Sequence, residues 1–509
     1  MTAGTAAPLI TLPHGGQLRG LWEQGVRVFR GVRYAQAPRG TLRFAAPVPA
    51  LPWPGVRDAT GFAPMAPQLP RTARADAPML GGDDCLAVNV WAPPAEPGAR
   101  LPVMVWVHGG GFFRGAASEP LYDGASFARQ GVVFVSLQYR LGIDGFLHFE
   151  DEGEAGSRGG AAPANRGLLD LLAALQWVRE HISAWGGDPA QVTVFGQSAG
   201  AGALACVLGM PASRGLLQRA ILQSPSVACQ TLQEAAAARR AVAALVGVAP
   251  SLAALGVAAR PAVLHAVHRL AADPALRQQH GLGIRNFFPL RPVVDGQVLV
   301  ASPLQALAQQ WAAHPPDLQV LVGSNAEEMR LYHVPGGAMD CVSEAQVLAF
   351  AQEVGLGADA VQALRATLPP THQTPGELLC ALQSDFYYRV PAQRIAALAS
   401  RWARSAHAYE FAWPSPQWRG RLGAAHGVEL PFVFGNLHTT TGQELTGPRP
   451  PTALAATMHQ GWVAFAQRGD PGWAPYAGVQ PLVQRFGVAS PAYAPHPEPV
   501  RLSLWDGLL

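Results

Sequence analysis

Lysine is absent from this 509-residue chain, in which all 37 basic side chains are arginine. Schiff-base aldolases, pyridoxal-phosphate enzymes and lysine-dependent kinases rely on a lysine ammonium group, so the sequence argues against these classes. Charged residues of both signs make up only 14% of the chain, against roughly 25% in an average globular protein. The formal net charge is +3 and no basic block occurs, which argues against nucleic acid as a partner.

Cysteine is also sparse. The chain has five cysteines and no C-x-x-C motif, which argues against a disulfide framework or a structural zinc site. No metal site is predicted. The N-terminus lacks a signal-peptide pattern. The best candidate for a membrane span lies between Arg240 and Arg260, but Gly247 and Pro250 interrupt it, so we expect two short amphipathic helices joined by a turn. We therefore predict a cytoplasmic protein without a membrane span.

Apolar residues are abundant, at 49% of the chain, and short β-rich runs alternate with helical periodicity. This pattern is typical of the α/β class, with a large mixed or mostly parallel central sheet covered by helices. We expect buried strands at 103–107, 132–136, 191–195, 318–322 and 407–411. We expect helices over 165–182 and 452–467 and helical insertions around 231–280 and 342–404. No linker divides the chain, so we predict a single domain over residues 1–509.

The strand at 191–195 leads into Gly196-Gln-Ser-Ala-Gly200, which fits the nucleophile elbow G-x-S-x-G. In such a turn the glycines permit a strained strand-to-helix connection that holds the serine hydroxyl out of the sheet. The motif alone is weak in a glycine-rich chain. The buried strand before it and the small residues after it favour Ser198 as a nucleophile over an ordinary turn serine.

The strand at 103–107 leads into a second glycine motif, His108-Gly-Gly-Gly-Phe112. Backbone N–H groups of such a loop can be aimed at the oxyanion that forms during acyl transfer. A phosphate-binding loop is the alternative, but no Gly-Lys-Ser/Thr follows. We therefore predict an oxyanion hole made by the N–H groups of Gly110, Gly111 and Ala199.

Fifteen histidines compete for the role of general base. His426 lies in a glycine-flanked loop that is C-terminal to the other candidates, as the order Ser, acid, His requires on an α/β-hydrolase fold. The acid is expected after the strand at 318–322, where Glu327 and Glu328 are adjacent. The pattern alone does not separate these two carboxylates.

These motifs, in this order, closely resemble the type-B carboxylesterase family, which includes bacterial p-nitrobenzyl-type esterases and animal cholinesterases. The resemblance extends from about residue 10 to about residue 505. The segments that carry it, besides the two glycine motifs, are Phe29–Pro38, Asp83–Val90, Tyr139–Phe146, Asn165–Leu168, Gly186–Pro189, Arg219–Ser224, Pro292–Gly296, Gly427–Leu430 and Gly469–Pro471.

The resemblance implies an α/β-hydrolase fold and a triad of Ser198, Glu328 and His426, because the family's acid is the second of the two adjacent positions. Two departures change what the resemblance implies. Cys85 stands where the family commonly forms a disulfide, but the partner region has no cysteine, so we expect a free, buried thiol. Gln197 replaces a glutamate before the nucleophile, and the loop before Cys85 lacks a tryptophan, so quaternary ammonium substrates are not expected.

We therefore predict a serine carboxylesterase that hydrolyses carboxylic esters through an acyl-serine intermediate, with water as co-substrate and no cofactor. The substrates are expected to be uncharged apolar or aromatic esters in a pocket lined by Phe112, Phe113, Gln197 and Phe288. An amidase or carbamate hydrolase with the same triad is one alternative, and a non-catalytic binding protein of this fold is another. The sequence leaves open the physiological substrate, the acyl and alcohol preference and the oligomeric state.

Overall fold

The structure, a computed structural model, describes residues 6–13, 16–71, 77–94, 96, 98–149, 162–285, 287–478, 481–487, 493–495 and 499–508. The chain forms two compact units. The first comprises Met1–Gln218 and Ala228–Gln310, and the second comprises Arg219–Val227 and Trp311–Leu509. No linker in the sequence marks a boundary at these positions, and the single domain over residues 1–509 stays a prediction.

The first unit is built on a twisted set of six strands in the order β9-β7-β8-β6-β4-β3. The central strand β7 pairs in parallel with β8 and β9, whereas β6, β4 and β3 are antiparallel additions. A small separate sheet has the order β1-β2-β5. The strands of this unit are β1 (Leu9–Thr11), β2 (Gln17–Arg19), β3 (Leu21–Glu23), β4 (Val26–Arg33), β5 (Val56–Asp58), β6 (Ala87–Ala92), β7 (Leu101–Val107), β8 (Val133–Leu137) and β9 (Gly187–Gln197).

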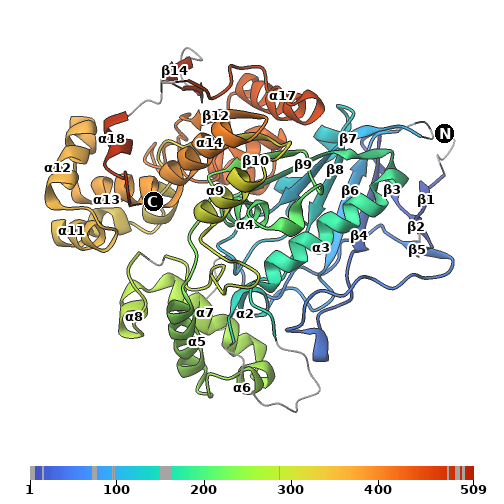
Figure 1. Cartoon of the computed structure of the whole chain (residues 1–509), viewed down its shortest axis with the longest axis horizontal. Helices are drawn as coiled ribbons and strands as arrows, with labels where there is room; N and C mark the ends of the chain where they lie inside the picture. The colour runs from blue at the N-terminus through green and yellow to red at the C-terminus, as the bar shows by residue number, and fades with distance from the viewer. Residues whose placement is uncertain are drawn as a thin grey trace. The chain divides into compact units, whose positions relative to one another are not determined.

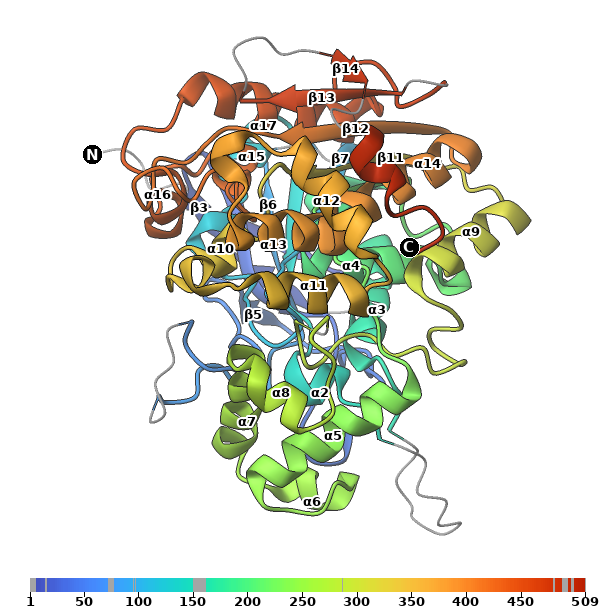
Figure 2. The same ribbon diagram turned by 90° about the vertical axis from the view of Figure 1, so that its left-hand side faces the viewer.

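Two helices of the first unit, α3 and α4, pack against each other and against β9. Four others, α5–α8, lie together as one group, drawn in green in Figures 1 and 2. The helices are α1 (Ala125–Ala128), α2 (Gly142–Phe146), α3 (Arg166–His181), α4 (Ala199–Leu208), α5 (Leu232–Val246), α6 (Leu252–Val257), α7 (Arg260–Ala272), α8 (Pro274–Gln279) and α9 (Pro303–Ala313), the last of which contains the boundary at Gln310. The group α5–α8 is the helical insertion expected around 231–280.

The second unit has five strands in the order β14-β13-β12-β11-β10, parallel except for the antiparallel pair of β13 and β14. The helices α11, α12 and α13 lie side by side in both views (Figures 1 and 2). The strands are β10 (Arg219–Gln223), β11 (Gln319–Asn325), β12 (Ser405–Phe411), β13 (Leu482–Phe486) and β14 (Tyr493–Pro495). The helices are α10 (Arg330–His333), α11 (Glu344–Glu353), α12 (Ala358–Thr367), α13 (Pro375–Ser384), α14 (Val390–Trp402), α15 (Leu430–Phe434), α16 (Thr440–Thr446), α17 (Thr452–Arg468) and α18 (Pro499–Ser503).

The continuous apolar runs of the sequence form the buried strands. Every residue of β6 and β8 is buried, as are the last five residues of β7, which suits strands covered on both faces. All five strands expected from the sequence are present. Four of them start within two residues of the predicted position, and β9 begins four residues earlier, at Gly187. The helical insertion expected around 342–404 begins with two separate helices, α11 and α12, because the chain turns between them at Gly355, whose φ is 89°.

The membrane-span candidate between Arg240 and Arg260 is two helices joined by a turn, as predicted. Helix α5 ends at Val246 and is followed by Gly247, which has a φ of 80°, and Ser251 caps the start of α6. Among the described residues, no helix has the length and apolarity needed to cross a bilayer. Residues 1–5 of the N-terminal segment lie outside the described residues.

The predicted state of Cys85 is confirmed: this cysteine is free and buried. Burial raises the pKa of its thiol well above the ordinary range, so the side chain behaves as a small apolar group in the core rather than as a reactive thiolate.

Candidate active site

Ser198 lies on a strained turn between a strand and a helix of the first unit. Strand β9 ends at Gln197 and helix α4 begins at Ala199. The backbone of Ser198 has φ 59° and ψ −126°, and the residue is 3% exposed. A non-glycine residue in this conformation costs of order 1–3 kcal/mol and persists only where the surrounding structure enforces it.

The glycines on either side of Ser198 are required by close packing. A Cβ atom on Gly200 would lie 2.2 Å from the carbonyl oxygen of Val107, and one on Gly196 would lie 2.8 Å from the backbone of Gly200. Because backbone atoms cannot give way as a flexible side chain can, any larger residue here would displace the turn. The G-x-S-x-G spacing is therefore required by the geometry of this turn and does not merely reflect the high glycine content of the chain.

The glycine loop, which we define as residues 108–111, lies directly against the predicted nucleophile. A Cβ atom on Gly109 would be 3.1 Å from Cβ of Ser198 and 2.8 Å from the carbonyl oxygen of Gln197. Gly110 and Gly111 have φ values of 116° and 65°, which L-residues rarely adopt. The structure thus brings together the two glycine motifs that the sequence singled out.

The backbone N–H groups of the glycine loop and of the residues that follow it have two roles. Those of Phe113 and Arg114 donate to the carbonyl of Gly110, at 3.4 and 3.1 Å. Those of Gly110 and Gly111 make no hydrogen bond within the part of the chain that the structure describes. The N–H of Ala199, in the first turn of α4, has no acceptor inside its helix. These three N–H groups can therefore serve a ligand.

His108 fixes the start of the glycine loop. Its Nδ1–H donates to the carbonyl of Gly109 at 2.8 Å, and its Nε2 accepts from the Gln138 amide at 3.1 Å. Burial lowers the pKa of His108 to about 4, so the ring is neutral at pH 7 and keeps this tautomer. The Tyr139 hydroxyl donates to the carbonyl of His108 at 2.8 Å. These buried hydrogen bonds therefore fix the conformation of the glycine loop, despite the flexibility of its glycines.

The side chains predicted to line a pocket divide into two groups. Phe288 contacts the glycine loop, because a Cβ atom on Gly111 would lie 2.6 Å from its ring, and its centroid is 6.2 Å from that of Phe113. The Gln197 side chain lies beside Gly109. The Phe112 ring instead is fully buried and packs on Phe146 at 4.8 Å, an arrangement typical of a core aromatic.

Glu328 and His426 are hydrogen-bonded in the second unit. His426 Nδ1 donates to Glu328 Oε2 at 2.6 Å, and the backbone N–H of Asn325, at the end of β11, donates to Glu328 Oε1 at 2.7 Å. The N–H of His426 also donates to the carbonyl of Glu328 at 3.0 Å. Glu328 is 0% and His426 4% exposed. A buried carboxylate at Nδ1 fixes the tautomer in which Nε2 carries the lone pair that can accept a proton.

The neighbouring Glu327 has a different set of contacts. Its Oε2 accepts from the N–H of Ala424 at 2.9 Å, its own N–H donates to the carbonyl of Ala424 at 3.0 Å, and its Oε1 pairs with Arg330 Nε at 2.9 Å. Glu328 thus contacts the histidine itself, whereas Glu327 holds the loop that carries the histidine. Spacing alone could not separate them, because their side chains leave the turn in different directions.

A second buried carboxylate, Glu429, was missed as a functional residue by the sequence analysis. Its two oxygens accept from Asn325 Nδ2 at 2.6 Å and Gln223 Nε2 at 3.2 Å, and Asn325 links it to Glu328. Burial, and next the charge of Glu328, raise the pKa of Glu429 to about 7. Its position three residues after His426 was the available signal, but a lone glutamate in a motif does not reveal its burial.

Two tyrosines beside the histidine were also missed. The ring centroids of Tyr388 and Tyr332 lie 4.4 and 5.7 Å from that of His426. They come from the π-helical turn before α14 and from α10, and nothing in their local sequence marks them as neighbours of the histidine.

No cluster of three or more histidine, cysteine, aspartate or glutamate side chains suited to a metal ion occurs among the described residues. The buried carboxylates near His426, Glu328 and Glu429, accept hydrogen bonds from backbone and side-chain amides. This environment is typical of carboxylates in an acid–base site.

The sequence profile of the carboxylesterase family matches residues 6–481. The chain belongs to this family. It is 37% identical to the para-nitrobenzyl esterase of Bacillus subtilis, over 90% of this chain and 89% of that protein. It is 33% identical to the phenmedipham hydrolase of Pseudarthrobacter oxydans, again over 90% and 89%.

The fold is similarly shared with solved family members. A carboxylesterase of Geobacillus stearothermophilus matches with a TM-score of 0.83 at 32% identity, covering 98% of this chain and 99% of that one. The predictions of the family, of the α/β-hydrolase fold with its large, mostly parallel sheet, and of a carboxylic ester hydrolase are confirmed.

Glu429 gives this carboxylesterase a testable pH dependence of stability. The folded state raises its pKa from 4.5 to about 7, so the stability contributed by the protonated carboxyl is fully present below about pH 4.5 and is lost as the pH rises through about 7. Replacing Glu429 by Gln removes this loss. We expect the variant's unfolding free energy, relative to the wild type, to improve by up to about 3 kcal/mol between pH 4.5 and pH 8.

Urea unfolding of both proteins at the two pH values measures this difference. Any cost of fitting the amide is the same at both pH values and cancels. A difference between the proteins that does not change with pH would contradict the assignment of a raised pKa to Glu429.

Proposed function

We propose that this esterase acts through a triad of Ser198, His426 and Glu328. The observation that carries the proposal is the strained turn of Ser198 directly against the glycine loop. The 2.6 Å hydrogen bond between His426 Nδ1 and Glu328 supports the roles of base and acid. Family membership supports their joint action with the serine.

In the proposed reaction, His426 Nε2 removes the proton from Ser198 Oγ as this oxygen attacks the ester carbonyl carbon. Glu328 orients the ring and stabilises the imidazolium that forms. The tetrahedral oxyanion accepts hydrogen bonds from the N–H groups of the oxyanion hole, which are those of Gly110, Gly111 and Ala199.

Collapse of the intermediate breaks the bond to the alcohol oxygen, which leaves with the proton from His426. Water then attacks the acyl-serine by the same route, with His426 again accepting the proton, and releases the acid and the free Ser198 hydroxyl. The chain's own residues supply every proton transfer in this cycle, and no cofactor is invoked.

The substrates are proposed to be uncharged apolar or aromatic esters. Phe113 and Phe288 beside the glycine loop support this choice, and Gln197 contributes no charge next to the nucleophile. The names of two relatives, a para-nitrobenzyl esterase and a phenmedipham hydrolase, support testing aromatic leaving groups. A cytoplasmic site of action is supported by five free cysteines.

Active-site labelling combined with a substrate panel tests the function. An organophosphate is expected to label one serine per chain, found at Ser198 by peptide mass spectrometry. Labelling should vanish in Ser198→Ala and remain in Ser183→Ala, which alters an exposed serine. Matched p-nitrophenyl esters and p-nitroanilides should show hydrolysis of the esters alone.

Hydrolysis of the anilides at a comparable rate would point instead to an amidase. Absence of both labelling and hydrolysis would point to a binding protein of this fold and would overturn the proposal.

A further inference from the structure

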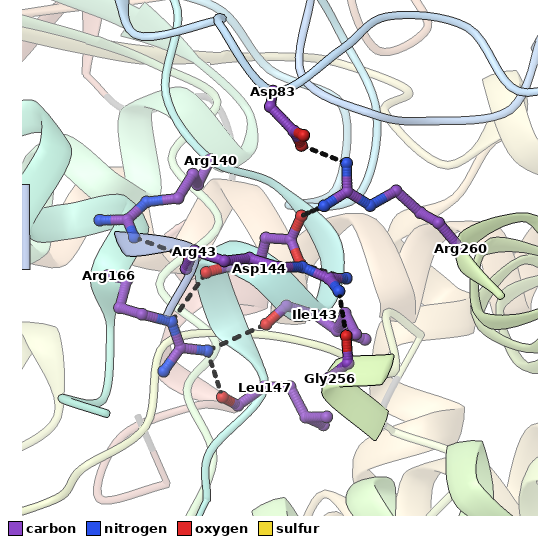
Figure 3. Close-up of polar contacts among 9 residues, drawn as sticks. All are labelled: Arg43, Asp83, Arg140, Ile143, Asp144, Leu147, Arg166, Gly256 and Arg260. Carbon is purple, nitrogen blue, oxygen red and sulfur yellow. Dashed lines mark hydrogen bonds and ion pairs between the residues drawn. The ribbon is translucent and has the colours of Figure 1, made fainter. Parts of the chain in front are cut away.

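Asp144 lies at the centre of an ion-pair cluster in the first unit. Its carboxylate accepts from Arg43 Nε at 2.9 Å, and its second oxygen lies 3.6 Å from Arg260 Nη2. Arg260 also pairs with Asp83. Figure 3 shows the guanidinium groups of Arg43 and Arg260 converging on the Asp144 carboxylate. The side chains of Asp144, Arg43 and Arg260 are only 12%, 11% and 19% exposed, so the cluster is largely shielded from solvent.

The helix that carries Asp144 supports the glycine loop. Asp144 belongs to α2, whose first residue, Gly142, donates its N–H to the carbonyl of Phe112 at 2.7 Å. The ring of Phe146, the last residue of α2, packs on Phe112. Since Phe112 directly follows the glycine loop, a shift of α2 would be transmitted to the predicted oxyanion hole.

The two arginines connect the same carboxylate to the helical insertion. Arg43 donates to the carbonyl of Gly256 in α6 at 2.6 Å, and Arg260 is the first residue of α7. Beyond α8 this stretch of chain leads to Phe288, whose ring contacts Gly111. Asp144 thus ties the junction of α6 and α7 to the helix beneath the glycine loop.

The charge balance of the cluster makes it sensitive to the loss of Asp144. Four guanidinium groups, those of Arg43, Arg140, Arg166 and Arg260, lie in this region with three carboxylates, those of Asp83, Asp144 and Asp170. Arg140 pairs with Asp170, Arg43 and Arg260 pair with Asp144, and Arg260 also pairs with Asp83.

Arg166 holds α2 in place through backbone carbonyls of the helix and of the residue after it. It donates to the backbone carbonyls of Ile143, Asp144 and Leu147 (Figure 3), and burial lowers its pKa to about 9. Without the Asp144 charge, Arg260 would keep only its pair with Asp83 and Arg43 would lose its carboxylate partner. The positive charges of Arg43, Arg166 and Arg260 would then repel one another more strongly, because they are largely shielded from solvent.

We propose that Asp144 is a specificity-positioning residue. It fastens the α6–α7 part of the insertion to α2 and thereby fixes how closely Phe288 approaches the glycine loop. The size of ester that the pocket accepts is then set by an ion pair remote from the reacting atoms. This inference rests on the proposed function for its kinetic consequence, but not for its structural one.

The test compares Asp144→Asn with the wild type on p-nitrophenyl acetate and on a bulky ester, 1-naphthyl benzoate. Because a loosened insertion widens the pocket, we expect kcat for the acetate to fall less than threefold. The ratio of kcat/KM for the bulky ester to that for the acetate should rise at least fivefold. Asp144→Glu, which keeps the charge, should return this ratio most of the way to the wild-type value. A role in general stability alone would not change the ratio.

Hydrogen exchange supplies a readout that does not need catalysis. In Asp144→Asn we expect faster exchange over residues 252–272 with no change over α4. Asp58→Asn, which breaks the exposed pair of Asp58 with Arg19, serves as the matched control and should alter neither readout. If Asp144→Asn fails to fold, Arg260→Gln, which keeps the Asp144–Arg43 pair, should show the same two changes to a smaller degree.

An unchanged substrate ratio together with unchanged exchange over 252–272 would overturn the inference. If the wild type hydrolyses no ester, the proposed function fails, while faster exchange in the variant still supports the connection between the insertion and α2.

Discussion

Ser198→Ala is expected to lower kcat for p-nitrophenyl acetate by about 10⁴-fold or more, with KM changed only a few-fold. The variant retains the glycine loop and the Glu328–His426 pair, so it still binds the ester and polarises its carbonyl. It cannot form the acyl-serine. Residual hydrolysis then depends on water attacking the bound ester, which the oxyanion hole accelerates only modestly.

The same argument predicts strong non-additivity. His426→Ala alone should cost nearly as much as Ser198→Ala, and the double variant should be scarcely slower than either, because the two residues act as one unit. Steady-state rates of the three variants, with Ser183→Ala as the control, measure this. Additive losses in the double variant, or more than 1% of wild-type kcat in Ser198→Ala, would contradict the assigned roles.

Asp170→Asn is expected to destabilise the protein by about 3–5 kcal/mol. Asp170 makes two charge-assisted bonds to Arg140, at 2.7 and 2.8 Å, and accepts the Arg140 backbone N–H at 3.0 Å. The Arg140 and Asp170 side chains are 2% and 0% exposed. The variant leaves a buried guanidinium without its counter-charge, and such a group cannot lose its proton to escape the cost.

Thermal unfolding followed by tryptophan fluorescence measures the effect, since the first unit contains buried tryptophans such as Trp106. Asp58→Asn, at an exposed ion pair with Arg19, should leave the midpoint nearly unchanged, because exposed pairs contribute little. A midpoint for Asp170→Asn equal to that of this control would show that the buried pair adds nothing to the stability of the fold.

The parts of the site that could be predicted from the sequence are those whose geometry depends on a few consecutive residues. The turn at Ser198 needs glycines at 196 and 200 because backbone atoms lie 2.2 to 2.8 Å from where their Cβ atoms would be. Sterics of this kind leave a recognisable local motif. The buried strands β7 and β8 are equally local, since burial on both faces demands an uninterrupted apolar run.

Contacts between segments that are distant in the sequence produce no such local motif. The adjacent Glu327 and Glu328 were equivalent by spacing, yet only Glu328 bonds His426, which is 98 residues away. Glu429 looked like one more motif residue until its burial beside Glu328 was apparent. Phe112 was expected to line a pocket, but its ring packs on Phe146 in the core.

The sequence by itself determined the family, the strand-to-helix turn of Ser198 and the glycine loop. The absence of lysine does not affect the proposed chemistry, which needs no ammonium group. Only the tertiary structure decided which polar side chains share a buried environment: Asp144 with an arginine 101 residues earlier, and Glu429 with the amide of Gln223, 206 residues earlier. The physical reason is range. Backbone sterics act between neighbours in the chain, whereas desolvation and Coulomb interactions depend on distance in space, which the chain reaches only when it is folded.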